Sequence, residues 1–423
     1  GIGSFDPELK VDLSADARDF TEAEKIALLT AEQSDFGVLE GSEISIRRSR
    51  PLNVVATGKL DISSGGNAMV NSTEDITVGD VSVAEELRLK TKRAIASLTG
   101  STLKAGSYIL EAANGGIGSA ASALKLAANG GSAAVVLTAR SGSDMHIEIA
   151  DAPELQIGNL YSTGSIAVAV NAGSIGTASG FAKATVLGKS IDLRADGTIG
   201  ADDAAIAIGT DGGTASLTAG GDIRVSNENE RLDLKAISTS GAFVLTGQSV
   251  YDTVVSGTIN ASLVDIVLSG ALRLGDTATV TAGSGGFDIA AATIYGGASG
   301  ALATTGNGGI ETAGDMILPY RVDAAGKLVL RSGGDIRRTQ WGSSIVGGML
   351  DMQAGGSIGN SLDYGFNFAA GSLKARAGGY ISLGPSAIGA GASVVSEGGD
   401  IVIGGLSDLS FEELSAAGDV RVV

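Results

Sequence analysis

The sequence predicts an all-β fold, a parallel β-helix in which turns of about 20–24 residues stack on one another. Three observations lead to this prediction: a short glycine motif that recurs along the chain, strand-like alternation after each copy, and an unusual composition. The chain has 423 residues, of which 65 are Gly, while 43% are apolar and only 4% are aromatic. The apolar share excludes disorder caused by low hydrophobicity. Small and branched side chains suit the narrow interior of a β-helix.

The repeated motif is one or two Gly, then a small or polar residue, then Ile, Val or Met. In the last third of the chain its copies lie at 313–316, 333–336, 355–358, 378–381, 398–401 and 417–420. The second position of each copy is a glycine, at 314, 334, 356, 379, 399 and 418. This even spacing is typical of one supersecondary unit repeated in a stack.

Apolar and polar residues alternate after the glycines, for example at 222–225 and 327–331. This alternation predicts short strands, whereas the spacing of helix faces is almost absent. Glycine suits the corners between strands, because tight bends often require a positive φ. Leucine-rich repeats and calcium-binding nonapeptide repeats are the competing arrays, but their signature motifs do not occur. We therefore expect 18–20 turns forming a rod of roughly 85–95 Å.

We expect one continuous shaft over residues 1–423, with an insertion or lateral decoration at 14–40. Within it, Thr21 and Glu24 have the spacing of a capping box, and Gly37 stands where a helix could end. The sequence thus predicts a short amphipathic helix near 21–33, packed on the side of the shaft, or else docking a partner. Because the chain begins and ends within the repeat pattern, we expect it to be part of a longer protein.

Charge and composition exclude several classes of protein. With 29 Lys and Arg against 47 Asp and Glu, the net charge is −18, which makes nucleic acid and anionic membranes poor partners. No uninterrupted apolar stretch reaches the length of a membrane-spanning helix, so we expect no membrane insertion. The lack of cysteine excludes disulfides, thiol nucleophiles and thiolate metal sites.

Few residues offer a basis for catalysis. His146 is the only histidine and has no nucleophile motif near it, and a single histidine without cysteine disfavours zinc or iron sites. No phosphate-binding loop motif occurs, so no cofactor is expected. The carboxylate pair Asp202 and Asp203 lies in a turn-like segment and is best interpreted as a solvated corner. The sequence therefore predicts a protein that is not an enzyme.

An aspartate follows the glycines in several copies of the motif, at Asp315, Asp335, Asp400 and Asp419. Stacked carboxylates repel one another unless a cation or an arginine lies between them, so a calcium ladder is one interpretation. The column is interrupted, however, and hydrogen bonding of each carboxylate to corner amides explains it without metal. We predict no metal site.

One segment stands out as a candidate ligand contact, because aromatic and arginine side chains often bind carbohydrate or protein. Its residues are Tyr320, Arg321, Arg331, Arg337, Arg338 and the single Trp341, and Tyr364, Phe366 and Phe368 follow one turn later. The predicted contact residues are Tyr320, Arg321, Arg337, Arg338 and Trp341. The alternative is that Trp341 merely caps a loop against the rod.

Gly-Gly-Ile-Gly-Ser at 115–119, followed by Ala-Leu-Lys-Leu at 123–126, resembles the filamentous haemagglutinin family of large exoproteins. Variants stand at 1–4, 173–177, 197–201 and 355–360, and the Gly-Gly-Asp-Ile turns resemble the shaft repeats of that family. The resemblance implies a right-handed β-helix, exported from a Gram-negative cell by two-partner secretion through an outer-membrane protein. It also implies an extracellular or cell-surface location.

The function expected from this resemblance is a structural and adhesive shaft that mediates adhesion, aggregation or biofilm formation. Its partners would be surface glycans or proteins of host or bacterial cells, or other copies of the chain. Two alternatives are a glycan-binding module on a β-helix and a β-helix enzyme that degrades polysaccharides.

Overall fold

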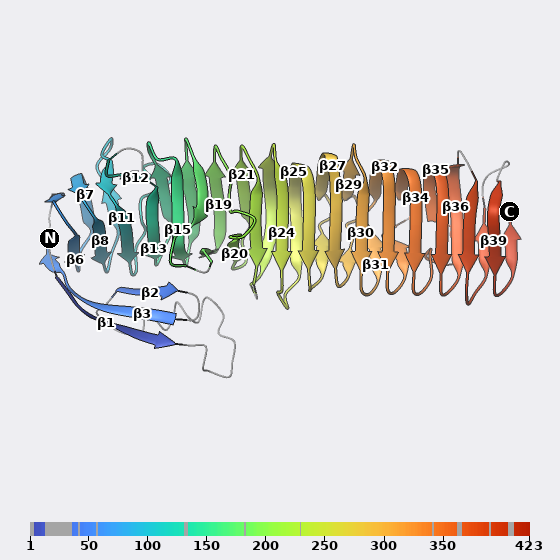
Figure 1. The fold of residues 1–423 in the computed structure, drawn as a ribbon, viewed down its shortest axis with the longest axis horizontal. Coiled ribbons are helices and arrows are strands. Elements are labelled where there is room, and N and C mark those ends of the chain that lie inside the picture. Colours follow the sequence, from blue (N-terminus) through green and yellow to red (C-terminus); the bar gives the residue numbers. More distant parts are fainter. Residues whose placement is uncertain are drawn as a thin grey trace. The chain divides into compact units, whose positions relative to one another are not determined.

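The computed structural model describes residues 4–12, 36–40, 43–55, 58–130, 134–181, 183–228, 230–340, 342–361, 366–388, 391–404 and 410–423 (Figure 1). Of residues 4–50 it describes the backbone. The chain divides into two compact units, Gly1–Glu230 (unit 1) and Arg231–Val423 (unit 2). Every regular element in the described residues is a β-strand, and the two units together contain about 17 solenoid turns. This confirms the predicted all-β parallel solenoid.

The first three strands form a small sheet of their own. They are β1 (Ser4–Asp12), β2 (Phe36–Glu40) and β3 (Glu43–Arg50), paired antiparallel in the order β1-β3-β2. This arrangement differs from the solenoid turn expected at the start of the chain. The predicted helix at 21–33 lies outside the described residues, and residues 36–40 of the predicted insertion form a strand.

The parallel solenoid strands of unit 1 begin after this sheet. They are β4 (Leu52–Val54), β5 (Lys59–Ser64), β6 (Ala68–Ser72), β7 (Ile76–Val83), β8 (Glu86–Thr91), β9 (Ile95–Ser97), β10 (Leu103–Ala105), β11 (Ser107–Ala112), β12 (Leu124–Ala128), β13 (Val135–Ser141), β14 (Met145–Ile149), β15 (Glu154–Ser162), β16 (Ser165–Val170), β17 (Ser174–Thr177), β18 (Thr185–Gly188), β19 (Ser190–Ala195), β20 (Ile206–Thr210), β21 (Ala215–Ala219) and β22 (Ile223–Asn227).

Unit 2 contains the remaining strands, several of which are long and bend from one wall of a turn into the next. They are β23 (Leu232–Thr239), β24 (Ala242–Gly247), β25 (Thr253–Leu268), β26 (Leu272–Leu274), β27 (Thr279–Ala291), β28 (Ile294–Tyr295), β29 (Ala301–Thr304), β30 (Gly308–Thr312), β31 (Met316–Leu318), β32 (Arg321–Ser332), β33 (Ile336–Arg338), β34 (Ser344–Ala354), β35 (Phe366–Ala377), β36 (Ile381–Ile388), β37 (Ala392–Ser396), β38 (Ile401–Ile403), β39 (Phe411–Ala416) and β40 (Val420–Val422).

The repeated motif of the sequence sets the register between the turns of unit 2. The apolar residue after each Gly motif pairs with its counterpart one turn later, in the column Met316, Ile336, Ile358, Ile381, Ile401 and Val420. The first five of these side chains are fully buried. The spacing of the motif in the sequence is therefore the actual length of each turn along this wall.

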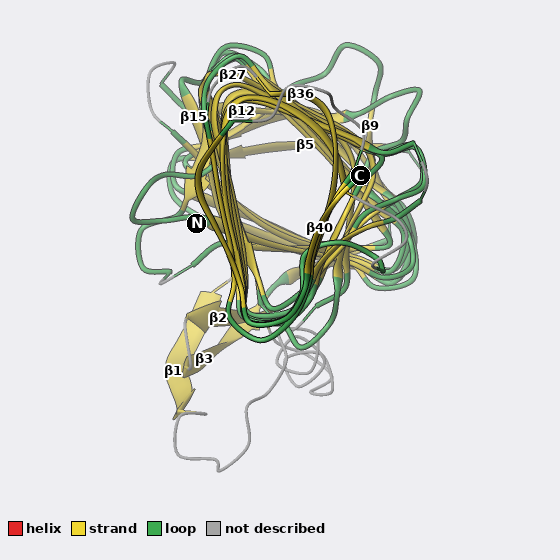
Figure 2. Ribbon diagram, turned by 90° about the vertical axis from the view of Figure 1, so that its right-hand side faces the viewer, coloured by secondary structure: helices red, strands yellow, loops and turns green. Residues whose placement is uncertain are grey.

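Unit 1 has a comparable buried column with less regular spacing. Ile95, Ile117, Met145, Ile166, Ile191 and Ala215 pair in this order. The longest step of this column runs from Ile117 to Met145, and the shortest step, from Met145 to Ile166, follows directly. Figure 2 shows that strands form the walls of the turns and that loops form many of the corners between them.

Aromatic residues are few, and several of those in the described residues fill the interior. Phe366 and Phe368, which the sequence analysis grouped with the candidate contact, are 0% and 1% exposed. Alternation explains this correction, because both face inward from β35, and Phe368 pairs with the buried Ile345. In unit 1, Tyr108 is buried and its hydroxyl hydrogen-bonds to the carbonyl oxygens of Leu103 and Ala127, each at 2.6 Å.

The Gly-Asp corners of the solenoid have a direct physical cause. The Asp315 carboxylate accepts a hydrogen bond from the Asp335 backbone amide of the next turn at 2.9 Å, and Asp335 accepts one from Ser357 at 2.6 Å. Gly334 and Gly356 precede these amides, and a Cβ on either glycine would lie within 3 Å of the carboxylate of the previous turn. Each aspartate thus bridges two turns, and the next turn needs glycine to make room for it.

Candidate functional site

Those predicted contact residues that the structure describes do not converge on one surface. Arg321 begins β32 and is exposed, but it forms an ion pair with Asp323 of the same strand. Tyr320 is 39% exposed, and its hydroxyl lies 3.8 Å from where a Cβ on Gly342 would stand. Trp341 lies outside the described residues. Arg321 and Arg337 belong to different walls of the turn, since β32 pairs with β29, β30 and β34, whereas β33 pairs with β31.

The two consecutive arginines of β33 point in opposite directions. Arg337 is half-exposed and pairs with Asp335, with Asp315 a further 3.9 Å contact. Arg338 is only 5% exposed, and burial lowers the pKa of its guanidinium. Its backbone amide and carbonyl bond to the Asn360 side chain, each at 3.0 Å. Arg338 is therefore an interior residue, and the alternation that buries Ile336 also buries it.

The aspartate column holds its carboxylates by hydrogen bonds to the backbone. In addition to the bonds of Asp315 and Asp335, Asp400 accepts one from the Asp419 amide at 2.8 Å. No group of three or more His, Cys, Asp or Glu side chains with metal-binding geometry occurs in the described residues. Asp202 and Asp203 lie on an exposed corner, where Asp202 pairs with Arg224 at 2.8 Å.

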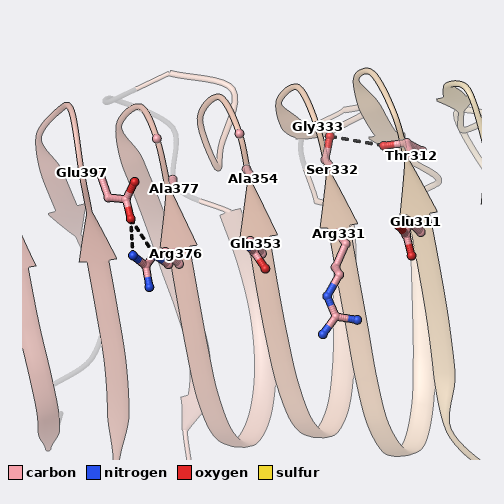
Figure 3. A pocket seen from close by; sticks show the side chains of 12 residues that line it. Glu311, Thr312, Arg331, Ser332, Gly333, Gln353, Ala354, Arg376, Ala377 and Glu397 are labelled. Carbon is pink, nitrogen blue, oxygen red and sulfur yellow. Dashed lines mark hydrogen bonds and ion pairs between the residues drawn. The ribbon is translucent and has the colours of Figure 1, made fainter.

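A hollow of unit 2 lies along one wall of consecutive turns, and we call it the corner groove (Figure 3). Its volume is about 550 Å³. The residues that line it are Glu311, Thr312, Arg331, Ser332, Gly333, Gln353, Ala354, Gly355, Arg376, Ala377, Gly378 and Glu397. They come from β30, β32, β34, β35 and the corners that follow these strands and β37.

The in-register pairing of the turns produces this groove. Glu311 pairs with Arg331, Arg331 with Gln353, and Gln353 with Arg376, so that these exposed side chains form one column across four turns. One residue further along, Thr312, Ser332, Ala354 and Ala377 face inward and are buried. The corner glycines then follow without side chains. The groove thus has a wall of long polar side chains and a floor of glycine backbone.

The corner glycines of the groove cannot be replaced easily. A Cβ on Gly355 or Gly378 would lie within 3 Å of the carbonyl oxygen of the preceding glycine in the column, Gly333 or Gly355. The glycine backbones stack directly on one another, which keeps the floor open over successive turns.

The charged side chains along the groove are Glu311, Arg331, Arg376 and Glu397, and only the last two form an ion pair. Arg376 Nε donates to Glu397 at 2.7 Å, and this ion pair links two neighbouring turns (Figure 3). Within the described residues, the Arg331 side chain has neither a hydrogen bond nor an ion pair. Arg331 therefore presents an exposed guanidinium between Glu311 and Gln353.

A smaller hollow of about 320 Å³ lies on unit 1 and contains the single histidine. His146 and Glu148 stand on one side, Asp192 and Arg194 on the other, with Ala167 and Ala169 between them. Asp192 and Arg194 pair at 2.7 Å, and Glu148 contacts Lys125 at 3.5 Å and Asn171 at 3.0 Å. Glu148, Asp192 and Arg194 of this hollow are all paired, whereas the corner groove also contains Arg331, which has no partner in the described residues.

Motif analysis by itself did not find the groove, although it noted Arg331 as part of a polar cluster. The signal was present in the aligned repeats: Glu311, Arg331, Gln353 and Arg376 each stand three residues before the second Gly of the motif. The register of the turns shows that a residue at this position of the motif faces outward next to a corner.

Comparisons with known proteins give no relative for this chain: no protein-family model, no curated protein and no solved structure matches it. In the described residues, no helix is long and apolar enough to cross a membrane. The fold and the groove are therefore the basis for any functional proposal.

Proposed function

We propose that this chain is a structural and adhesive shaft segment of an exported bacterial surface protein of the filamentous haemagglutinin type. In this proposal the solenoid is right-handed, reaches the cell surface through an outer-membrane secretion partner, and acts in adhesion, aggregation or biofilm formation. The observation that carries the proposal is the in-register stacking of unit 2, which repeats similar polar positions from turn to turn. Repeated weak contacts on one chain raise the apparent affinity through effective concentration.

The surface composition supports a role in contact with other molecules. The net charge of −18 favours solubility and disfavours non-specific binding to nucleic acid. Many of the exposed charged side chains in the described residues are joined in ion pairs, such as Lys59 with Asp61 and Lys327 with Asp351. Exposed pairs of this kind contribute little to stability.

Binding, and not catalysis, is the role that we propose for the corner groove. Its two carboxylates, Glu311 and Glu397, stand at opposite ends, about four turns apart, which corresponds to roughly 19 Å at the spacing of neighbouring strands. A pair of catalytic carboxylates in a glycosidase is separated by only about 5–9.5 Å. The alternative of a polysaccharide-degrading enzyme predicts the release of oligosaccharides, which an assay over a panel of acidic glycans would detect.

Binding of the labelled, purified chain to bacterial and host cells tests the adhesive proposal. We expect saturable binding that excess unlabelled chain competes away. A signal that rises linearly with concentration and resists competition would contradict the proposal.

A further inference from the structure

The corner groove suggests a specific ligand class. We propose that it binds a linear glycan in which uronic acids alternate with neutral sugars, so that only every second sugar carries a carboxylate, and whose long axis follows the stacked turns. This inference deepens the adhesive function proposed above and rests on it.

The shape of the groove indicates an elongated ligand. The lining residues repeat at the same place in successive turns, from Glu311 to the corner after β37, so that the hollow extends along the stack. Its floor is the backbone of Gly333, Gly355 and Gly378, which carry no side chains to block a polymer. A compact ligand would use only part of such a surface.

The positive charges of the groove indicate carboxylates on the ligand. Arg331 has no partner among the described residues, and the ion pair with Glu397 holds Arg376 in place. The guanidinium fork matches a carboxylate in a bidentate geometry. Arg331 and Arg376 stand two turns apart, about 9–10 Å at the usual spacing of neighbouring strands. The ligand should therefore present carboxylates at about that interval, and Gln353 between them offers an amide to hydroxyl groups.

The flanking charges argue against a densely charged polymer. Glu311 and Glu397 stand at the two ends of the column, where they would repel a polyanion that continued along the groove. The net charge of −18 adds to this repulsion. A heavily sulfated chain such as heparin should thus bind more weakly than a glycan in which uronic acids alternate with neutral sugars.

The strand pairing argues against an extended peptide as the ligand. Peptides commonly add as a strand to an open sheet edge. The strands beneath the groove have no such edge, because β32 pairs with β30 and β34, and β34 pairs with β35. The lining also lacks an aromatic or large aliphatic side chain that could form a pocket for an apolar anchor.

Isothermal titration calorimetry with a hexamer in which glucuronate alternates with N-acetylglucosamine tests the proposal on the full chain. We expect the wild-type chain to bind this hexamer, and the Arg331→Gln and Arg376→Gln variants each to weaken binding about tenfold. Arg194→Gln, which removes from unit 1 an arginine about as exposed as Arg376, is the matched control and should leave the affinity unchanged. A fully methyl-esterified hexamer of the same length should not bind, because it has no carboxylates.

Circular dichroism of all three variants establishes that they keep the fold, as expected for substitutions at exposed positions. The proposal is overturned if the hexamer does not bind, if the Arg194→Gln variant loses as much affinity as the groove variants, or if heparin binds more tightly than the hexamer. Cell binding of the wild-type chain is measured in parallel. If the chain binds cells but not the hexamer, the proposed ligand of the groove is wrong and the adhesive function stands. If the chain binds the hexamer but not cells, the adhesive function is wrong.

Discussion

Units 1 and 2 are built on the same principle, but they differ in the regularity of their turns. Along the buried column of unit 2, from Met316 to Val420, the steps are nearly equal. In unit 1 the step from Ile117 to Met145 is markedly longer than the step from Met145 to Ile166. Regular turns align the outward side chains as well as the inward ones. The corner groove of unit 2 is a consequence of this regularity.

The largest effect should come from the buried columns themselves. Ile336→Ala in unit 2 removes a fully buried side chain that pairs with Met316 and Ile358 of the neighbouring turns. Ile199→Ala in unit 1 removes one that pairs with Ile175 and Ile223. Each should lower the free energy of unfolding by about 2–5 kcal/mol. Urea unfolding monitored by hydrogen exchange of each unit measures both values. A cost below about 1 kcal/mol for either variant would show that its column is not tightly packed.

The corner glycines should give the next largest effect. Gly356→Ala places a Cβ against the Asp335 carboxylate and the backbone of Gly334, and should destabilise unit 2 by about 1–3 kcal/mol. Gly65→Ala in unit 1 is the matched control, because a Cβ there meets nothing within 4 Å. Thermal unfolding should separate the two variants clearly. Equal stability of the two would contradict the explanation of the Gly-Asp motif.

Loss of a carboxylate bridge between turns should cost less. Asp335→Ala leaves the Ser357 amide without its acceptor, and Asp144→Ala does the same to Ser165 in unit 1, where the hydrogen bond measures 2.8 Å. Each should cost about 1–2 kcal/mol. Asp335→Asn keeps an oxygen acceptor and should retain most of the stability. An Asn variant as unstable as the Ala variant would assign the role to the charge and its pairing with Arg337.

The smallest effect at neutral pH concerns the buried tyrosine of unit 1. Burial raises the pKa of the Tyr108 hydroxyl above its usual value of 10.0, because ionisation in the interior is unfavourable. The stability that depends on the neutral hydroxyl is fully present below pH 10 and is lost as the pH rises above it. Hydrogen exchange of β11 at increasing pH should show this loss in the wild-type chain.

The Tyr108→Phe variant is the matching test of that interpretation. It should be somewhat less stable at neutral pH, because the hydrogen bonds to Leu103 and Ala127 are gone, yet lose less stability in alkaline solution. If the variant loses stability in alkaline solution as steeply as the wild-type chain does, the group responsible for that loss is not the Tyr108 hydroxyl.

Local patterns predicted the solenoid well because the Gly-Asp-Ile motif encodes a contact between turns. Asp335 needs glycine in the next turn, and Ile336 needs an apolar residue in the turns before and after it. Both requirements therefore make the same residue types recur in the sequence at intervals of one turn. The antiparallel sheet of β1–β3 was not predicted, because alternation is the same in parallel and antiparallel strands.

The candidate site was harder to predict, because it depends on which residues the register brings together. Grouping by proximity in sequence joined Arg337 and Arg338, although consecutive residues of a strand face opposite sides. Arg331 and Arg376 are far apart in the chain and become neighbours in one groove only through the stacking of turns. Alignment of the repeats at their glycines would have found them.

The most direct test of the account is the binding of fluorescently labelled chain to bacterial and host cells, for the wild type, the Arg331→Gln/Arg376→Gln double variant and the Arg194→Gln control. The account predicts saturable binding for the wild type and the control, and a marked loss for the double variant. Absence of saturable binding by the wild type would contradict the adhesive function, and undiminished binding by the double variant would show that adhesion does not use the corner groove.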